Sequence, residues 1–187
     1  MNQTILAVDG GATKTTMTIR TVDGQILFSS TTTGSNYQAI GRERVQQVFE
    51  QLLIQASEVI TERTITVAVF AIAGIDTAED ARIVREITEA SITNSPFIVE
   101  KLIVENDVEA TLLGIANGQP TTLLISGTGA ICFSFDGKKT VRAGGWGHRV
   151  GDEGSGYWIG QQVAKAIFRA ADGRDEPTIL TDLVLSS

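Results

Sequence analysis

The order of apolar and polar residues divides the chain into strands and helices. Short runs rich in β-branched residues predict strands, and two Asp-Gly pairs, at 23–24 and 136–137, predict hairpin turns. Apolar residues three and four positions apart predict amphipathic helices. The predicted strands are 3–8, 14–21, 25–33, 64–73, 97–104, 121–126, 130–135 and one ending near 143, and the predicted helices are 45–60, one capped by Thr77 and Asp80, one from 106 or 107 to 116, and 157–171.

One order of elements occurs twice along the chain. A strand, a turn of small residues, a strand, an Asp-Gly turn and a strand follow one another over residues 3–33 and again over 121–143. The segment Asn117-Gly118-Gln119-Pro120 is the best boundary between the two copies, because its residues favour turns. We therefore expect an α/β protein with two related domains that divide near residue 118.

Composition removes several classes of function. The chain has 187 residues and a net charge of −7, which argues against a broad nucleic-acid-binding face. Its longest apolar run, 67–75, is about half a membrane span, and no signal peptide is visible, so no membrane partner is expected. The single cysteine, Cys132, forms no internal disulfide and no thiolate metal site alone, so a reducing, cytoplasmic setting is expected. Glycine numbers 19, about a tenth of the chain, against the usual ~7%.

Two glycine-containing turns are candidates for phosphate binding. Residues 9–15, Asp-Gly-Gly-Ala-Thr-Lys-Thr, connect two predicted strands, and successive backbone N–H groups in such a turn can bind an anion. Asp9 beside it could hold Mg²⁺, directly or through water. Ser126-Gly127-Thr128-Gly129 occupies the same place in the second copy, so the two turns could bind a polyphosphate together. A plain hairpin turn remains the alternative for residues 9–15.

Two polar residues stand where a sugar or an alcohol could be bound. Asp107 follows the predicted strand 97–104; it is either the cap of the next helix or a general base, which a helix N-terminus would keep ionised. Asn36 lies in a polar break after the third strand. It either caps the following helix or reads hydroxyl or amide groups with its donor and acceptor.

Residues 144–156 form the richest glycine segment, Gly-Gly-Trp-Gly-His-Arg-Val-Gly-Asp-Glu-Gly-Ser-Gly. Trp146 offers an aromatic face to the C–H face of a sugar, and Asp152 and Glu153 offer carboxylates to its hydroxyls. The segment is predicted to form one wall of a binding site. The alternative is a domain hinge in which Asp152 caps the next helix.

Together these motifs resemble the BadF/BadG/BcrA/BcrD ATPase family, and within it the N-acetylglucosamine kinases. The resemblance rests on residues 9–15, Asn36, Asp107, residues 126–129 and above all residues 144–155, and it covers the whole chain. It implies the actin-like ATPase (ribonuclease H-like) fold of the actin, hexokinase and sugar-kinase superfamily. Two related α/β domains would each open with a three-stranded meander, with the ligand cleft between them. Because family members are longer, it also implies a complete first domain, 1–118, and a truncated second domain of the same type, 119–187.

The resemblance also assigns roles to positions of this chain. Asp107 is the base that activates the sugar hydroxyl, and Asp9 holds Mg²⁺, through water. The implied cofactors are ATP and Mg²⁺. The residues implied to bind the ATP phosphates are Asp9, Gly10, Gly11, Thr13, Lys14, Gly127 and Thr128. Those implied to bind the sugar are Asn36, Asp107, Gly129, Ala130, Gly145, Trp146, Gly147 and Asp152. Ala130 departs from the small polar residue often seen there, which leaves the sugar preference open.

Three functions follow as hypotheses. The first is an ATP-dependent amino-sugar kinase, or the N-terminal portion of one, that phosphorylates N-acetylglucosamine or a relative such as glucosamine or N-acetylmuramic acid. A homodimer is the oligomer considered for it. The second is a non-catalytic sugar-binding or regulatory fragment. The third is a dehydratase activase, an ATPase of the same family that carries an iron–sulfur cluster; Cys132 alone offers no ligand set for one.

Overall fold

The computed structural model describes residues 3–186 and consists of two compact units, residues 1–111 and 112–187. The outermost residues of the predicted domains, 1, 2 and 187, lie outside the described part. The division between the units falls within helix α4, Asp107–Ala116. The chain has an α/β fold, as the sequence predicts.

The first unit is built on a five-stranded sheet in the order β3-β2-β1-β4-β5. Strands β1 to β3 form an antiparallel meander, and β4 and β5 add to β1 in parallel. The chain enters β4 from helices α1 and α2 and enters β5 from helix α3, as is usual for strands that pair in parallel. The strands are β1 Thr4–Gly10, β2 Lys14–Thr21, β3 Ile26–Thr33, β4 Thr64–Ile72 and β5 Ile98–Asn106, and the helices are α1 Tyr37–Ile40, α2 Arg42–Val59 and α3 Ala78–Thr93.

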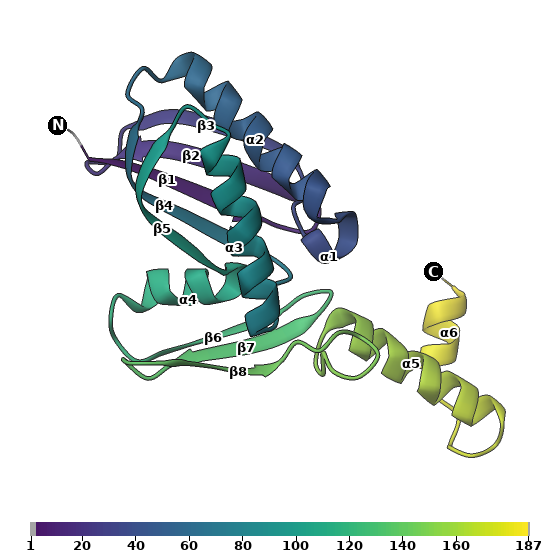
Figure 1. The fold of residues 1–187 in the computed structure, drawn as a ribbon. Helices are drawn as coiled ribbons and strands as arrows, with labels where there is room; N and C mark the ends of the chain where they lie inside the picture. Colours follow the sequence, from purple (N-terminus) through teal and green to yellow (C-terminus); the bar gives the residue numbers. More distant parts are fainter. Residues whose placement is uncertain (1–2, 187) are drawn as a thin grey trace. The chain divides into compact units, whose positions relative to one another are not determined.

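Helices α2 and α3 pack against each other and against one face of this sheet (Figure 1). Alternate residues of β1 are buried there, among them Leu6 and Val8, because successive side chains of a strand point to opposite faces. Phe49 of α2 meets Phe70 of β4 edge to face, with ring centres 5.2 Å apart. The core therefore fixes β1 and β4 side by side and leaves Ala7 and Asp9 exposed on β1.

The second unit contains a three-stranded antiparallel meander, β6 Thr121–Ser126, β7 Ala130–Phe135 and β8 Thr140–Gly144. Helix α5, Gly156–Ala171, follows, and α6, Leu180–Leu185, packs against it. The two helices enclose an apolar groove of about 440 Å³, lined by Val163, Ile167, Phe168, Val184 and Leu185 among others. Within residues 3–186, no helix combines the length and the apolarity needed to cross a membrane.

The predicted element order is confirmed, with strand ends within two residues of those expected and three strands, 14–21, 121–126 and 130–135, matched at both ends. Both hairpin meanders form, so the repeated order seen in the sequence is a repeated structure. Two short helices were not defined by the sequence pattern. Helix α1 has four residues and α6 has six, too few to show a helical period.

Candidate functional site

Three carboxylates lie at one edge of the first unit's sheet, and we call Asp9, Asp76 and Asp107 the acidic edge. Gly10 of β1, Ile72 of β4 and Asn106 of β5 stand in register across three parallel strands. Each carboxylate stands next to, or shortly after, the carboxyl end of one of these strands. The carboxyl ends of parallel strands are where α/β proteins commonly bind ligands, so this edge is the natural place for a site.

Asp107 begins helix α4, but its neighbour caps that helix. The Asn106 Oδ1 atom accepts hydrogen bonds from the backbone N–H groups of Val108, at 2.9 Å, and Glu109, at 3.1 Å. The alternative in which Asp107 is the principal cap is therefore wrong, although its own Oδ1 also accepts from Val108, at 3.0 Å. Asp107 is half-buried, and helix α4 does not depend on its carboxylate as the main cap.

The environment of Asp107 raises the pKa of its carboxyl group. Burial raises the pKa of Asp107 above its usual 3.8, and the negative charges of Asp9 and Asp76 raise it further. The backbone N–H of Val108 at the helix N-terminus lowers this pKa, but burial and the like charges outweigh it, so the net shift is upward. That the helix N-terminus keeps Asp107 ionised at the working pH stays a prediction. A base with a raised pKa holds a proton more strongly once it has taken it, which suits general-base catalysis.

The predicted phosphate-binding turn, residues 9–15, is tightly packed at its base and exposed at its tip. The Gly11 N–H donates to the Lys14 carbonyl at 2.9 Å, and the Ser35 N–H donates to the Gly11 carbonyl at 3.0 Å. A Cβ at Gly34 would overlap the carbonyl of Ala12, so only glycine lets these two segments meet. Thr13 and Lys14 are exposed at the tip, where a hydroxyl and an ammonium group could reach a phosphate.

Asn36 caps helix α1 and packs on Gly74. Its Oδ1 atom accepts from the backbone N–H of Gln38 at 2.9 Å. Gly74 has φ +87°, and a Cβ there would come within 2.6 Å of the same oxygen. Among residues 3–186 the Asn36 Nδ2 group donates no hydrogen bond, so the side chain combines the capping role with a free donor.

In the second unit, the turn between β6 and β7 is held to the start of α5. The Gly127 N–H donates to the Gly129 carbonyl and the Gly156 N–H donates to the Gly127 carbonyl, both at 2.8 Å. The Ser126 hydroxyl donates to the Gly154 carbonyl at 2.9 Å. Gly127 and Thr128 remain exposed at the tip, as a phosphate-binding turn requires.

The Asp152 carboxylate lies close to two other predicted sugar-binding positions, Gly147 and Gly129. Its carboxylate is largely buried, with 9% of the residue exposed, and Oδ1 accepts from the Gly147 N–H at 3.2 Å. A Cβ at Gly129 would lie 3.0 Å from Oδ2. Asp152 has φ +61°, a left-handed conformation that Asp tolerates better than most residues. Ser155, not Asp152, caps α5 by accepting from the Trp158 N–H at 3.0 Å, so the capping alternative for Asp152 is wrong.

Trp146 is 63% exposed and stacks on a guanidinium group. The Arg142 Cζ atom lies 4.7 Å from the centre of its ring. Arg142 also donates from Nη2 to the Gly145 carbonyl at 2.6 Å and from Nε to the Gly144 carbonyl at 3.2 Å. These contacts fix the turn that presents Trp146. Ala130, the first residue of β7, is half-buried.

Within residues 3–186, no three His, Cys, Asp or Glu side chains are grouped closely enough to form a metal site. Mg²⁺ that accompanies a nucleotide usually keeps several waters and takes only one or two carboxylates plus phosphate oxygens. The exposed carboxylate of Asp9, at the end of β1, fits that mode of binding and does not require a protein cage.

Comparison with known proteins places the chain in a family. The model of the BadF/BadG/BcrA/BcrD ATPase family matches residues 6–184. The chain belongs to that family. Its motifs at 9–15, 126–129 and 144–155 all lie within the matched region.

Two curated relatives are sugar kinases. The N-acetylmuramic acid/N-acetylglucosamine kinase of Clostridium acetobutylicum is 34% identical over 184 residues, which cover 97% of this chain and 58% of that protein. The N-acetyl-D-glucosamine kinase of Dictyostelium discoideum is 28% identical over 194 residues, covering 96% of this chain and 59% of that protein. The chain therefore spans a little under three fifths of the length of these relatives.

Solved structures agree with this fold. A protein of Chromobacterium violaceum, provisionally assigned as an N-acetylglucosamine kinase, superposes with a TM-score of 0.67 at 26% identity and covers 99% of this chain and 64% of its own. The glucokinase of Balamuthia mandrillaris gives a TM-score of 0.57 at 14% identity, covering 94% of this chain and 57% of its own, and supports the fold alone. The fold is thus an α/β fold of the sugar-kinase and actin-like ATPase type.

The structure brings together Asp9 and Asp107 in the first unit, and Gly129, Gly147 and Asp152 in the second. Sequence reasoning missed Asp76, Gly74 and Arg142. Asp76 and Gly74 follow β4 and give no signal, because their roles depend on strand register. Arg142 could have been suspected from its place shortly before Trp146.

Proposed function

We propose that this chain is the sugar-binding and phosphate-binding portion of an ATP-dependent kinase that transfers a phosphoryl group to a hydroxyl of N-acetylglucosamine or a related amino sugar. The observation that carries the proposal is the acidic edge. Asp107 stands there with a raised pKa, at the carboxyl ends of parallel strands, beside the phosphate-binding turn of residues 9–15. The two curated relatives act on amino sugars, which supports this substrate class.

Each loop has a role in the proposed reaction. Backbone N–H groups of residues 10–14 and 127–128, with the side chains of Thr13 and Lys14, bind and orient the phosphates of ATP. Mg²⁺ held through water by Asp9 would neutralise phosphate charge. Asp107 accepts the proton of the attacking sugar hydroxyl. Asn36, Gly129, Ala130, Gly145, Trp146, Gly147 and Asp152 hold the sugar, with its hydroxyls toward polar groups and a C–H face toward the indole ring.

Positioning and charge neutralisation supply most of the rate in phosphoryl transfer, so this set of groups is sufficient chemically. The domain organisation proposed with it is a first domain of residues 1–118 and the first part of a second domain of the same type, residues 119–187. The two meanders of identical strand order support that duplication. A cytoplasmic setting and a homodimer stay predictions.

Two measurements, made one after the other, test the proposed function. Calorimetry with N-acetylglucosamine, N-acetylmuramic acid, glucosamine and glucose, with and without ATP, establishes which sugar binds. A coupled assay of ADP release with the sugar that binds then measures turnover. In an active protein Asp107→Asn should lower kcat by a factor of about 10²–10⁴ while sugar binding is retained. Undiminished turnover would remove Asp107 from its role.

A second candidate function is that of a non-catalytic sugar-binding or regulatory protein. A non-catalytic sugar-binding protein would bind the amino sugar with an affinity that ATP does not change, and would release no ADP. The activase function has no support, because the sequence contains one cysteine and an iron–sulfur cluster needs several ligands.

A further inference from the structure

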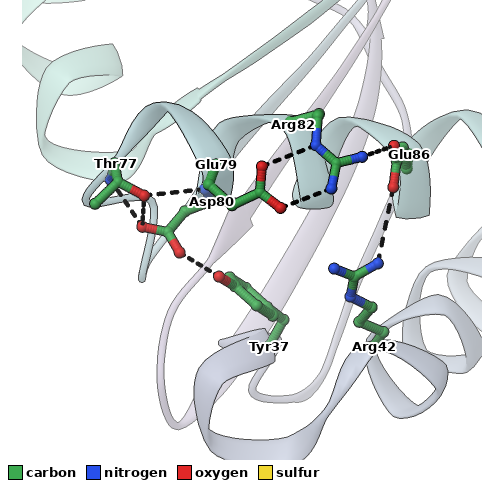
Figure 2. Close-up of polar contacts among 7 residues, drawn as sticks. All are labelled: Tyr37, Arg42, Thr77, Glu79, Asp80, Arg82 and Glu86. Atoms are coloured by element: carbon green, nitrogen blue, oxygen red, sulfur yellow. Dashed lines mark hydrogen bonds and ion pairs between the residues drawn. The ribbon is translucent and has the colours of Figure 1, made fainter.

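A buried carboxylate joins the segment that carries Asn36 to the loop that follows β4 (Figure 2). Asp80 lies in the first turn of α3 and is 8% exposed. Its Oδ2 atom accepts hydrogen bonds from the backbone N–H groups of Asp76, at 3.1 Å, and Thr77, at 2.7 Å, and from the Thr77 hydroxyl, at 2.7 Å. With the bond from the Asp80 N–H to the Thr77 hydroxyl, these contacts complete a capping box.

The second carboxylate oxygen of Asp80 makes a contact that is not part of the capping box. Its Oδ1 atom accepts a hydrogen bond from the hydroxyl of Tyr37, a residue 43 positions away. The Gln38 Nε2 group also approaches Oδ1, at 3.4 Å, and donates to the Gly74 carbonyl at 3.0 Å. The Asp80 carboxylate thus connects the start of α1 to residues 76 and 77, and Gln38 connects it to Gly74.

Asn36 sits between these two connected segments. It directly precedes Tyr37 and Gln38, and its Oδ1 atom accepts from the Gln38 N–H at 2.9 Å. On the other side its amide packs against Gly74, where no side chain would fit. The orientation of the Asn36 amide therefore depends on how the start of α1 is held against Gly74.

The protonation states of Asp80 and Tyr37 at neutral pH favour the hydrogen bond between them. Burial alone would raise the pKa of Asp80, but the hydrogen bonds from Tyr37, Thr77 and Asp76 outweigh it and lower the pKa to about 2. The same bond raises the pKa of Tyr37, which keeps its hydroxyl as a donor. An ionised acceptor and a neutral donor form one of the stronger kinds of hydrogen bond.

We propose that Asp80 and Tyr37 are a positioning pair that holds the Asn36 amide on Gly74 in the orientation that binds a sugar. The role of Asn36 in sugar binding rests on the proposed function, whereas the link between the two segments does not. Neither Asp80 nor Tyr37 needs to touch the sugar, so both act through Asn36.

The same helix supplies a matched control. Glu86 of α3 forms an ion pair with Arg82 and a second with Arg42 of α2, at 3.8 Å (Figure 2). These side chains are about half exposed, and exposed ion pairs contribute little to stability. Glu86→Gln therefore removes a contact that the same helix, α3, makes with α2, without touching Asp80 or Asn36.

The experiment compares Tyr37→Phe, Asp80→Asn and Glu86→Gln. Amide hydrogen exchange is measured over residues 36–40 and 73–77, and N-acetylglucosamine and ATP are titrated separately by calorimetry. Tyr37→Phe removes a single oxygen atom and keeps the ring. We expect it to speed exchange in both segments and to weaken sugar binding about fivefold while ATP binding stays unchanged, with Glu86→Gln like the wild type.

The outcomes separate the two proposals. If the wild-type chain binds no amino sugar, the proposed function fails, and the exchange data still decide whether the pair links the two segments. Exchange and sugar affinity of Tyr37→Phe within about twofold of the wild type would overturn the positioning pair, even if Asp80→Asn fails to fold. Equal loss in Glu86→Gln would overturn it as well, because the effect would then be general loosening of α3.

Discussion

The carboxylate of Asp152 lies directly over Gly129, so that a Cβ at position 129 would come within 3.0 Å of Oδ2. The same carboxylate accepts the Gly147 N–H at 3.2 Å. A residue of the glycine-rich segment is thereby tied to the turn between β6 and β7. Two stretches that the sequence separates by more than a whole strand meet at one acidic side chain.

Gly129→Ala tests this relationship. The added methyl group should displace the Asp152 carboxylate by a few tenths of an ångström and weaken sugar binding about tenfold, because hydrogen bonds depend steeply on geometry. Calorimetric titration with N-acetylglucosamine measures the loss. Gly160→Ala is the matched control: a Cβ there meets nothing within 4 Å, and alanine favours the α5 helix, so sugar binding should be unchanged. Wild-type affinity in Gly129→Ala would contradict the assignment.

The pH dependence of activity should reflect the effect of the neighbouring negative charges of the acidic edge on the pKa of Asp107. A general base works only when deprotonated, and the pKa of Asp107 lies above 3.8, so activity should begin to fall at a higher pH than for an ordinary aspartate. Asp76→Asn removes a like charge, lowers the pKa of Asp107 and should move this fall to lower pH. Glu79→Gln, exposed on α3, should leave the profile in place. The carbon-13 shift of the Asp107 carboxyl gives the same titration without turnover, and an unmoved midpoint in Asp76→Asn would refute the coupling.

Asp80 should make folding stability depend on acid. Its pKa is about 2 in the folded chain and close to 3.8 when unfolded. A depressed carboxyl pKa contributes stability that is fully present above the unfolded value and is lost as the pH falls toward the folded value. Since one pKa unit corresponds to about 1.4 kcal/mol, the contribution near neutral pH is about 2 kcal/mol.

Urea unfolding of the wild type and Asp80→Asn between pH 7 and pH 2 measures this contribution. The difference in the free energy of unfolding should be largest at neutral pH and shrink below about pH 4. Glu86→Gln is again the control, since its exposed ion pairs should give a small difference throughout this range. A constant difference for Asp80→Asn would show that shape, not charge, matters at this position.

Arg142 should determine how Trp146 is presented. Arg142→Lys keeps the charge but loses the planar group that stacks on the indole ring and reaches two carbonyls. We expect a shift in Trp146 fluorescence and an amino-sugar affinity reduced about threefold, in line with a cation–π contact of about 0.5–1 kcal/mol. Recording the spectra in a Trp158→Phe background isolates the signal. Arg169→Lys, on the surface of α5, should change neither quantity.

Much of the fold was predictable because its signals are local. The Asp-Gly turns, the β-branched runs and the Thr77–Asp80 capping box each act within a few residues, and each formed as expected. The repeated order of strand, turn and strand predicted both meanders for the same reason.

The site was harder to predict, since its chemistry depends on register between distant strands. The pKa of Asp107 reflects burial and the charges of Asp9 and Asp76, which only the pairing of β1, β4 and β5 brings near. The balance between a helix N-terminus and those charges cannot be read from residues 105–109 alone. Likewise, nothing in the sequence near Tyr37 indicates a partner at Asp80.

The strand order of the first unit also has a consequence for the route by which the chain folds. The β1–β2–β3 meander closes short loops, whereas β1 must wait for β4, and β4 for β5, across helices α2 and α3. Contacts between residues far apart in sequence form slowly. The phosphate-binding turn should therefore be structured early, and Asp107 should reach Asp9 only in the last step. Pulse-labelling hydrogen exchange would show protection of β2 amides before those of β5. During synthesis the turn proposed to bind phosphate would then form before the proposed general base, Asp107, is in place.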